Sequence, residues 1–169
     1  VVMIGFCNLV GGQDELIFDG GSAFFDAEGG IIARGAQFEE DLVVADVNLG
    51  SVFRQRLHDP RRRKDRLIEK DIDEQVVRLA LEPLSQPAQP PVGPTIQPLL
   101  EPTAEVYRAL VLGTRDYVRK NGFGNVVIGL SGGVDSSLTA AVAGDALGAE
   151  HVIGVFMPSQ FSSVESRED

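Results

Sequence analysis

Residues 125–156 read NVVIGLSGGVDSSLTAAVAGDALGAEHVIGVF, and this stretch decides the fold class. The apolar runs 125–130 and 152–156 have the length and composition of strands buried on both faces. Between them, residues 138–147 are rich in alanine and predict a helix that can lie close against a sheet. Strand, tight loop, helix and strand make one βαβ unit, whose strands are parallel and whose crossover is right-handed in nearly all proteins. The stretch therefore predicts an α/β fold with a parallel sheet.

The loop at residues 131–137, SGGVDSS, leaves the carboxyl end of the first predicted strand and enters the N-terminus of the helix. Anions bind at such places, because the first-turn amides have no intrahelical partner and the helix dipole is positive there. Gly132 and Gly133 permit positive φ and let amides approach phosphate oxygens without a Cβ in the way. The three serines add hydroxyl donors. The loop therefore predicts a site for phosphate groups.

Asp135 is an unfavourable neighbour for polyphosphate unless a cation lies between them, and Mg²⁺ takes carboxylate and phosphate oxygens together. The pattern is neither a Walker A loop, which needs a lysine, nor the dinucleotide-binding GxGxxG fingerprint. A Gly-Ser turn with Asp135 as the helix N-cap and no ligand is the plain alternative. The strand–loop–helix context of the motif favours the phosphate site.

Upstream, residues 103–122 predict a helix that Thr103 caps, with Glu105 in its first turn and Gly122 at its end. Seven of the nine prolines fall within residues 83–102. Proline fixes φ and lacks an amide donor, so this segment predicts an extended linker and a domain boundary. Residues 60–82 place apolar residues at helical spacing among charges.

Residues 1–58 are rich in β-branched and aromatic residues and are punctuated by glycine pairs. The predicted strands are 16–18, 23–25, 31–33 and 42–45, with a hairpin-like connection at 26–30. This part predicts the tail of a sheet-containing domain. The organisation that follows has three parts, which are 1–60, 61–102 and 103–169.

The composition of the 169 residues, 43% hydrophobic and 24% charged, is that of a globular protein. A net charge of −10 argues against a nucleic-acid or anionic-membrane surface, and the basic run 61–64 is followed by acids, which favours a solvated helix face. Cys7 is the only cysteine, so no internal disulfide forms, in agreement with a reducing cytosol. No apolar run approaches the ~18 residues of a membrane span.

Three segments resemble known families. The form SGGxDS at 131–136 resembles the PP-loop of the ATP pyrophosphatase superfamily, whose members cleave ATP between the α and β phosphates. Residues 157–166, MPSQFSSVES, resemble the segment of NAD synthetases that borders the adenine pocket. Residues 8–22, NLVGGQDELIFDGGS, look like the late part of the nitrilase-like glutaminase domain of glutamine-dependent NAD synthetases, and 37–42 fit the same family. The chain thus resembles an internal fragment of such an enzyme.

The resemblance implies the tail of a nitrilase-like α/β sandwich followed by the first βαβ unit of a PP-loop, Rossmann-like parallel sheet. It implies a cytoplasmic, homo-oligomeric ligase that adenylates nicotinic acid adenine dinucleotide with ATP and Mg²⁺. Ammonia from glutamine would then displace AMP and give NAD. Asp135 is the implied Mg²⁺ ligand. The implied ATP-binding residues are Gly129, Leu130, Ser131, Gly132, Gly133, Val134, Asp135, Ser136, Ser137 and Met157.

The glutaminase Glu, Lys and nucleophilic Cys of the family would lie upstream, so we expect no catalytic residue of that triad here. Cys7 is expected to be a small buried apolar residue. Asp14 and Glu15 are expected in a turn, with a place in the lining of the glutamine pocket as the alternative, and His58 and His151 are expected at the ends of helices or strands. Two alternatives stay open: another PP-loop amidotransferase, such as a GMP-synthetase-like ligase, and an inactive nucleotide-binding or assembly module. By itself, the 169-residue piece is expected to have neither glutaminase nor synthetase activity.

Overall fold

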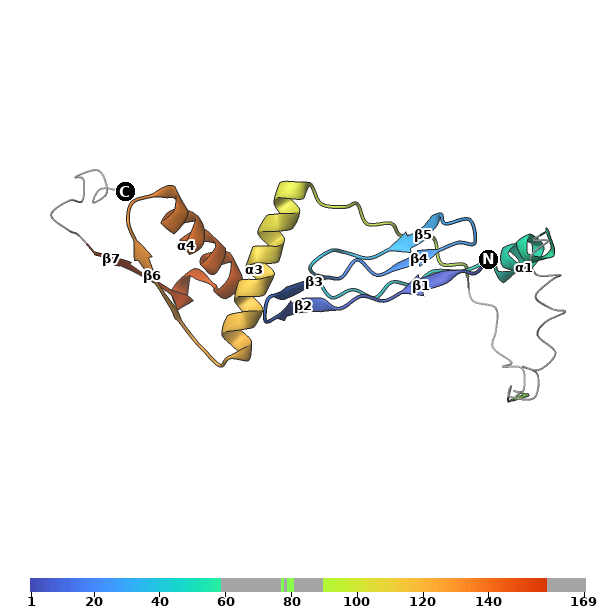
Figure 1. Ribbon diagram of the computed structural model, residues 1–169, viewed down its shortest axis with the longest axis horizontal. Helices are drawn as coiled ribbons and strands as arrows, with labels where there is room; N and C mark the ends of the chain where they lie inside the picture. The colour runs from blue at the N-terminus through green and yellow to red at the C-terminus, as the bar shows by residue number, and fades with distance from the viewer. Residues whose placement is uncertain (59–76, 78, 81–89, 158–169) are drawn as a thin grey trace. The chain divides into compact units, whose positions relative to one another are not determined.

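The structure is a computed structural model that describes residues 1–58, 77, 79–80 and 90–157. The chain forms two compact units, each built from segments distant in sequence (Figure 1). Unit 1 contains Val1–Phe6, Ser22–Gly35 and Leu42–Gln97, and unit 2 contains Cys7–Gly21, Ala36–Asp41 and Pro98–Asp169. The predicted helix at 60–82 lies almost wholly outside the described residues, as does the segment from Pro158 onward. The three-part domain division stays a prediction.

Unit 1 contains an antiparallel sheet with strand order β1-β4-β5. Its strands are β1 (Ile4–Phe6), β4 (Ala23–Phe25) and β5 (Ile31–Arg34), and helix α1 spans Leu49–His58. The predicted hairpin at 26–30 is confirmed, and the Asp26 carboxylate closes it by accepting the N–H groups of Glu28 (3.0 Å) and Gly30 (2.6 Å).

The described part of the proline-rich segment is extended, as predicted. The Arg34 N–H donates to Thr95 O, and the Gln97 N–H donates to Arg34 O, both at 3.0 Å. The predicted strand at 42–45 is wrong, because these residues are assigned neither strand nor helix, and Leu42 is 84% exposed. A β-branched run becomes a strand only when a partner strand and a buried face are available to it.

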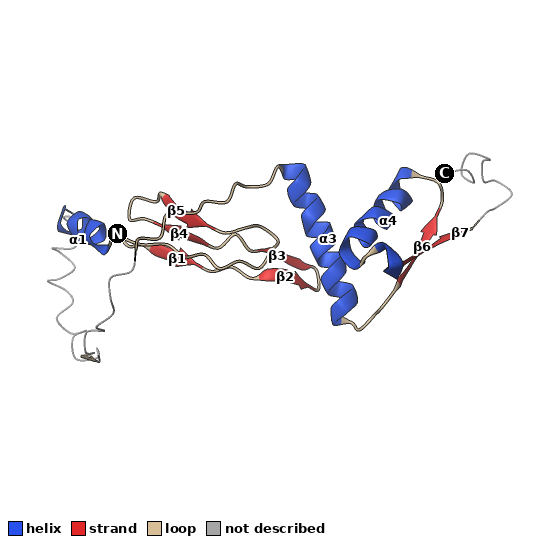
Figure 2. Cartoon of the chain, turned by 180° about the vertical axis from the view of Figure 1, so that it is seen from behind, coloured by secondary structure: helices blue, strands red, loops and turns tan. Residues whose placement is uncertain are grey.

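Unit 2 contains the βαβ unit (Figure 2). Strand β6 (Val126–Leu130) and strand β7 (Val152–Phe156) are parallel, in register from Val126 opposite Val152 to Leu130 opposite Phe156. Helix α4 (Val134–Leu147) and the short 3-10 helix η3 (Ala149–His151) connect them. The predicted α/β fold with a parallel pair is therefore confirmed, although α4 begins four residues earlier than the predicted helix.

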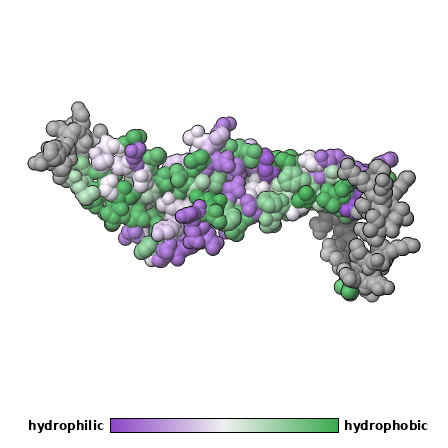
Figure 3. Space-filling model, in the orientation of Figure 1, coloured by the Kyte–Doolittle hydropathy of each residue, from purple (hydrophilic) through white to green (hydrophobic). Residues whose placement is uncertain are grey.

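The face of β6 that carries Val126 and Ile128 lies toward α4 and helix α3 (Pro102–Lys120). The buried residues of these two helices are Leu112, Val118, Val142, Ala143 and Ala146. Burial of β6 on both faces is not observed, because Val127 on the opposite face is 67% exposed to solvent. Figure 3 shows apolar surface, in green, over the part of the molecule that holds α4, β6 and β7.

Helix α3 begins one residue before the predicted cap. Pro102 occupies its first position and Glu101 is the N-cap, so Thr103 lies inside the helix and is not its cap. Proline favours this position because an N–H there would have no intrahelical partner. The predicted end is confirmed, since Asn121 caps the helix and Gly122 follows with φ +76°.

Unit 2 also contains an antiparallel hairpin of β2 (Val10–Gln13) and β3 (Leu16–Asp19). Asp14 and Glu15 form its turn, as expected, and Asp14 has φ +51°. The hairpin packs against α3, which lies roughly a hundred residues further along the chain.

Candidate nucleotide site

The candidate site lies at the carboxyl ends of the two parallel strands of unit 2. Because Leu130 pairs with Phe156, the residues that follow them, Ser131 and Met157, leave the same edge of the sheet. A Cβ built at Gly129 would lie 3.0 Å from Met157 Cε, so the methionine side chain reaches back over the strand. The structure therefore brings together three groups of predicted residues: the end of β6, the loop and Met157.

The loop turns sharply at Gly132, which has φ +74°, a conformation that side-chain-bearing L residues adopt only at a cost. Gly133 is the N-cap of α4, with φ −96° and ψ 155°, and no side chain caps the helix. The Ser137 N–H is the first to bond a carbonyl one helical turn back, donating to Gly133 O at 3.2 Å. The N–H groups of Val134, Asp135 and Ser136 come before it and have no such intrahelical partner. These amides and the helix dipole make the loop suited to an anion.

Serine hydroxyls hold this loop in shape. Ser136 Oγ donates to Gly133 O (2.9 Å) and accepts the Ser131 N–H (3.3 Å), which links the end of β6 to the first turn of α4. Ser137 Oγ also lies 3.2 Å from Gly133 O. The loop residues are otherwise exposed, and a ligand can reach them from solvent.

Asp135 lies in the first turn of α4, two residues after the cap. It is therefore not the N-cap that the ligand-free alternative required. Asp135 is exposed, and a carboxylate is a ligand that suits Mg²⁺. Within the described residues no group of three or more His, Cys, Asp or Glu side chains could hold a metal ion, so Mg²⁺ at Asp135 would need phosphate oxygens and water to complete its coordination.

The remaining predicted residues lie away from this loop in sequence. Cys7 is exposed, so its expected burial is wrong. Its apolar neighbours in sequence, Ile4 and Phe6, are themselves exposed. His58 is the last residue of α1, and His151 ends η3 with its Nδ1 3.0 Å from Asn125 Oδ1. Both histidines thus lie at element ends, as expected.

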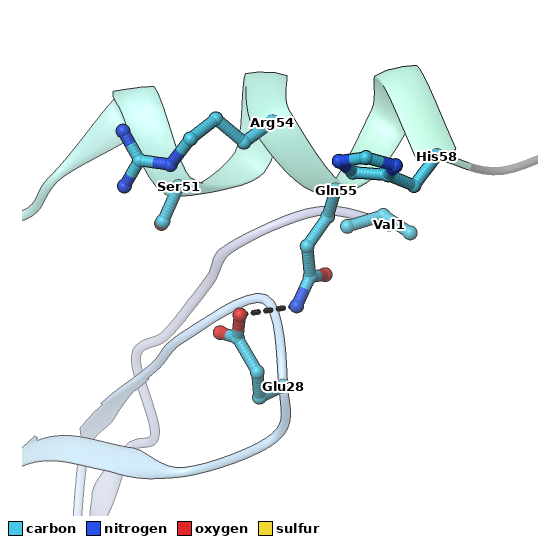
Figure 4. A pocket seen from close by; sticks show the side chains of 6 residues that line it. All are labelled: Val1, Glu28, Ser51, Arg54, Gln55 and His58. Carbon is cyan, nitrogen blue, oxygen red and sulfur yellow. Dashed lines mark hydrogen bonds between the residues drawn. The ribbon is translucent and has the colours of Figure 1, made fainter.

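Unit 1 has a hollow of about 400 Å³ that is open to solvent (Figure 4). It lies between the β4–β5 turn and α1, where Gln55 Nε2 donates to the Glu28 carboxylate. The groups that line it are Val1, Glu28, Ser51, Arg54, Gln55 and His58. They include neither a phosphate-binding loop nor a hydrogen-bonded nucleophile–base pair, so the loop of unit 2 is the better candidate site.

Two side-chain contacts of α3 within unit 2 were not predicted from the sequence. Tyr107 Oη donates to Asp145 Oδ2 (2.7 Å), which ties α3 to the helix that begins at the loop, and this hydrogen bond raises the pKa of the phenol. The Asp116 carboxylate accepts the Gly12 N–H (2.9 Å) and lies beside Arg115 and Lys120. The sequence alone indicates an ion pair between an Asp and a Lys four residues apart on a helix. It does not indicate the hydrogen bond between Asp116 and a backbone N–H of a hairpin that is distant in sequence.

The pKa of Asp116 predicts a local loss of structure in acid. Burial raises this pKa, but the hydrogen bond from Gly12 and the charges of Arg115 and Lys120 outweigh burial and hold it below its ordinary value. A depressed pKa stabilises the fold above the unfolded-state pKa, and this contribution is lost as pH falls through the folded-state value. Hydrogen exchange at the Gly12 amide, corrected for its intrinsic pH dependence, should therefore lose protection in strong acid. In Asp116→Asn this pH dependence should be absent, and an unchanged pH dependence would contradict the assignment.

The class of protein follows from comparison with known sequences. The family model described as NAD synthase matches residues 106–169, which include most of α3, the loop, α4 and the parallel strands. Among described residues no helix is long and apolar enough to cross a membrane.

The particular family follows from relatives that match nearly the whole chain. A glutamine-dependent NAD(+) synthetase of Thermotoga maritima is 49% identical over 99% of this chain and 28% of its own length. One of Aquifex aeolicus is 46% identical over 98% of the chain and 28% of its own length. The solved structure of an Acinetobacter baumannii glutamine-dependent NAD+ synthetase in complex with ADP has a TM-score of 0.67 and 38% identity, over 99% of this chain and 25% of that one. The chain belongs to the glutamine-dependent NAD(+) synthetase family and spans roughly a quarter of the length of these relatives, as the sequence motifs predicted.

Proposed function

We propose that residues 131–137 bind the phosphates of ATP in a full-length enzyme that converts nicotinic acid adenine dinucleotide to NAD. In this proposal residues 1–60 are the last part of a nitrilase-like glutaminase domain, and residues 103–169 are the first part of the PP-loop synthetase domain. Residues 61–102 connect the two domains. Glutamine supplies the ammonia. A cytoplasmic location and a homo-oligomeric assembly belong to the same proposal and rest on the family.

One observation carries the assignment of the ATP site. Because β6 and β7 are parallel and in register, the Ser131–Ser137 loop and Met157 follow the carboxyl ends of the two strands on the same side of the sheet. Helix α4, which connects the strands, has its N-terminus in this loop. This is the place where α/β sheets bind nucleotides. Gly129, Leu130 and Met157 would line the nucleoside side, and the loop from Ser131 to Ser137 the phosphate side.

The reaction follows from the chemistry of a carboxylate, which is a poor acceptor for ammonia. A carboxylate oxygen of the dinucleotide attacks the α phosphorus of ATP, and the bond to the β-phosphate oxygen breaks, so pyrophosphate leaves. Ammonia then attacks the acyl carbon of the adenylate, and AMP leaves with the carboxylate oxygen it received. The amides of Val134, Asp135 and Ser136, aligned at the helix N-terminus, stabilise the charge that develops on pyrophosphate.

Mg²⁺ would be held by Asp135 together with phosphate oxygens and would supply positive charge at the leaving group. The chain's own part is to hold the loop ready before ATP arrives. Ser136 does this by bridging Ser131 and Gly133, so that the loop loses little conformational freedom on binding.

The test is a product analysis with the full-length enzyme that contains this segment. With ATP, Mg²⁺ and nicotinic acid adenine dinucleotide, either glutamine or ammonium chloride should support NAD formation, with AMP and pyrophosphate released in equal amounts. Formation of ADP and phosphate, or no NAD with either nitrogen source, would overturn the proposed function.

A further inference from the structure

Each strand of the parallel pair contains one glycine, Gly129 in β6 and Gly154 in β7. Neither has a positive φ, so the backbone conformation does not require glycine at either position. Glycine weakens the interior of a strand, because it has no side chain to pack and loses more conformational freedom on folding than other residues. It often marks a place where another group approaches closely. At both positions that group is a side chain from the end of the neighbouring strand.

The side chain of Leu130 occupies the space beside Gly154. A Cβ built at Gly154 would lie 2.7 Å from Leu130 Cδ1 and 3.5 Å from Leu130 Cγ. Because Leu130 is paired with Phe156, and Gly154 with Ile128, the leucine and the glycine share one face of the pair. Carbon atoms in contact are about 3.5–4.0 Å apart, so a methyl group at position 154 would displace the leucine.

The same arrangement occurs on the opposite face, with the two strands exchanged. A Cβ built at Gly129 would lie 3.0 Å from Met157 Cε. Gly129 is paired with Val155, so its open side lies on the face opposite to Leu130. The end of each strand therefore sends a side chain across its neighbour at the position of a glycine. We call Gly129, Leu130, Gly154 and Met157 the strand-end interlock.

The strand-end interlock is joined directly to the phosphate loop. Leu130 precedes Ser131, whose N–H donates to Ser136 Oγ, and Ser136 Oγ donates to Gly133 O at 2.9 Å. The first of these bonds, at 3.3 Å, is already longer than the usual range of about 2.7–3.2 Å. A displacement of Leu130 moves the adjacent N–H and weakens this bond. The shape of the loop therefore depends on the space that Gly154 leaves for the leucine.

We propose that Gly154, which lies outside the loop, is a positioning residue for ATP binding. By leaving room for Leu130 it keeps the loop in the shape that receives the phosphates, and Gly129 does the same for Met157 on the nucleoside side. This inference rests on the proposed function, in which the loop binds ATP. A side chain displaced by a methyl group has to return to its place when ATP binds, and this reordering lowers the affinity. Once ATP is bound, the reaction proceeds as before.

The experiment uses the full-length enzyme with ammonium chloride as the nitrogen source, so that glutamine hydrolysis does not contribute. Gly154→Ala should raise the KM for ATP about fivefold, while kcat and the KM for the dinucleotide change by about twofold at most. Gly129→Ala should separate the two KM values in the same way. Thermal unfolding is measured in parallel, because a role in fold stability alone would lower the unfolding temperature without changing the KM for ATP.

A second substitution tests whether Gly154 acts through Leu130. Leu130→Val removes the δ carbon that the new methyl group would meet. In the Leu130→Val background, Gly154→Ala should therefore change the KM for ATP by much less than it does in the wild-type background. Gly124→Ala is the matched control, since no atom lies within 4 Å of a Cβ built there. It should leave kcat and both KM values unchanged.

Three results would overturn the inference. They are an unchanged KM for ATP in both Gly154→Ala and Gly129→Ala, an equal effect on the KM values for ATP and the dinucleotide, and an undiminished effect of Gly154→Ala in the Leu130→Val background. Failure of the wild-type enzyme to form NAD from ATP and ammonium would instead overturn the proposed function, so the two failures are distinguishable.

Discussion

Replacing Asp135 by asparagine in the full-length enzyme is expected to lower NAD formation by about 100-fold or more, with glutamine or with ammonium as nitrogen source. The substitution keeps the shape of the side chain and removes the charge that would hold Mg²⁺ against the phosphates. Glutamine hydrolysis, assayed as glutamate release, should be spared, because in the proposed function its site belongs to the glutaminase domain of the full-length enzyme. Steady-state assays over a range of Mg²⁺ concentrations should show that added metal does not restore the rate.

The matched control for this change is Asp145→Asn on the same helix. Asp145 accepts a hydrogen bond from Tyr107, and an asparagine carbonyl can accept the same bond. This variant should stay within a few-fold of wild type. Equal loss of NAD formation and glutamine hydrolysis in Asp135→Asn, or equal effects of the two substitutions on NAD formation, would contradict the role assigned to Asp135.

Gly132→Ala should reduce ATP-dependent NAD formation by about tenfold, because a residue with a Cβ at φ +74° costs about 1–2 kcal/mol. The effect should appear chiefly as a higher KM for ATP if the loop relaxes to another conformation when empty. Thermal unfolding measured in parallel checks that the variant remains folded.

Gly144→Ala is the control, because Gly144 does not have the positive φ that requires a glycine at position 132. It lies inside α4 with no atom near an added Cβ, so alanine should leave activity unchanged and favour the helix by up to about 1 kcal/mol. If Gly132→Ala is as active as Gly144→Ala, the loop does not need its left-handed turn, and the account of phosphate binding is wrong.

Local patterns were sufficient to predict most elements of the fold. The apolar runs at 125–130 and 152–156 and the alanine-rich segment between them predicted the parallel pair and its helix, and the turn chemistry at Asp26 predicted a hairpin. Two errors concern individual elements: Pro102, not Thr103, determines the start of α3, and the apolar run at 42–45 is not a strand. Two others concern burial, because Cys7 and Val127 are exposed.

The candidate site was predictable where its residues are contiguous. The loop at 131–137 combines glycines, serines and an acid in one motif, and the parallel register then brings Met157 to it. The contacts of Asp116 with Gly12 and of Tyr107 with Asp145 were not predictable, because their partners lie 104 and 38 residues away. Periodicity and capping rules describe neighbours along the chain and carry no information about such pairs.

The central claim is that ATP is attacked at its α phosphorus by the carboxylate of the dinucleotide at the Ser131–Ser137 loop. The most direct measurement starts from nicotinic acid adenine dinucleotide labelled with ¹⁸O in its carboxylate and follows the label by mass spectrometry in a single turnover of the full-length enzyme. The account predicts one heavy oxygen in AMP and none in pyrophosphate. Label in pyrophosphate or inorganic phosphate, with AMP unlabelled, would contradict it.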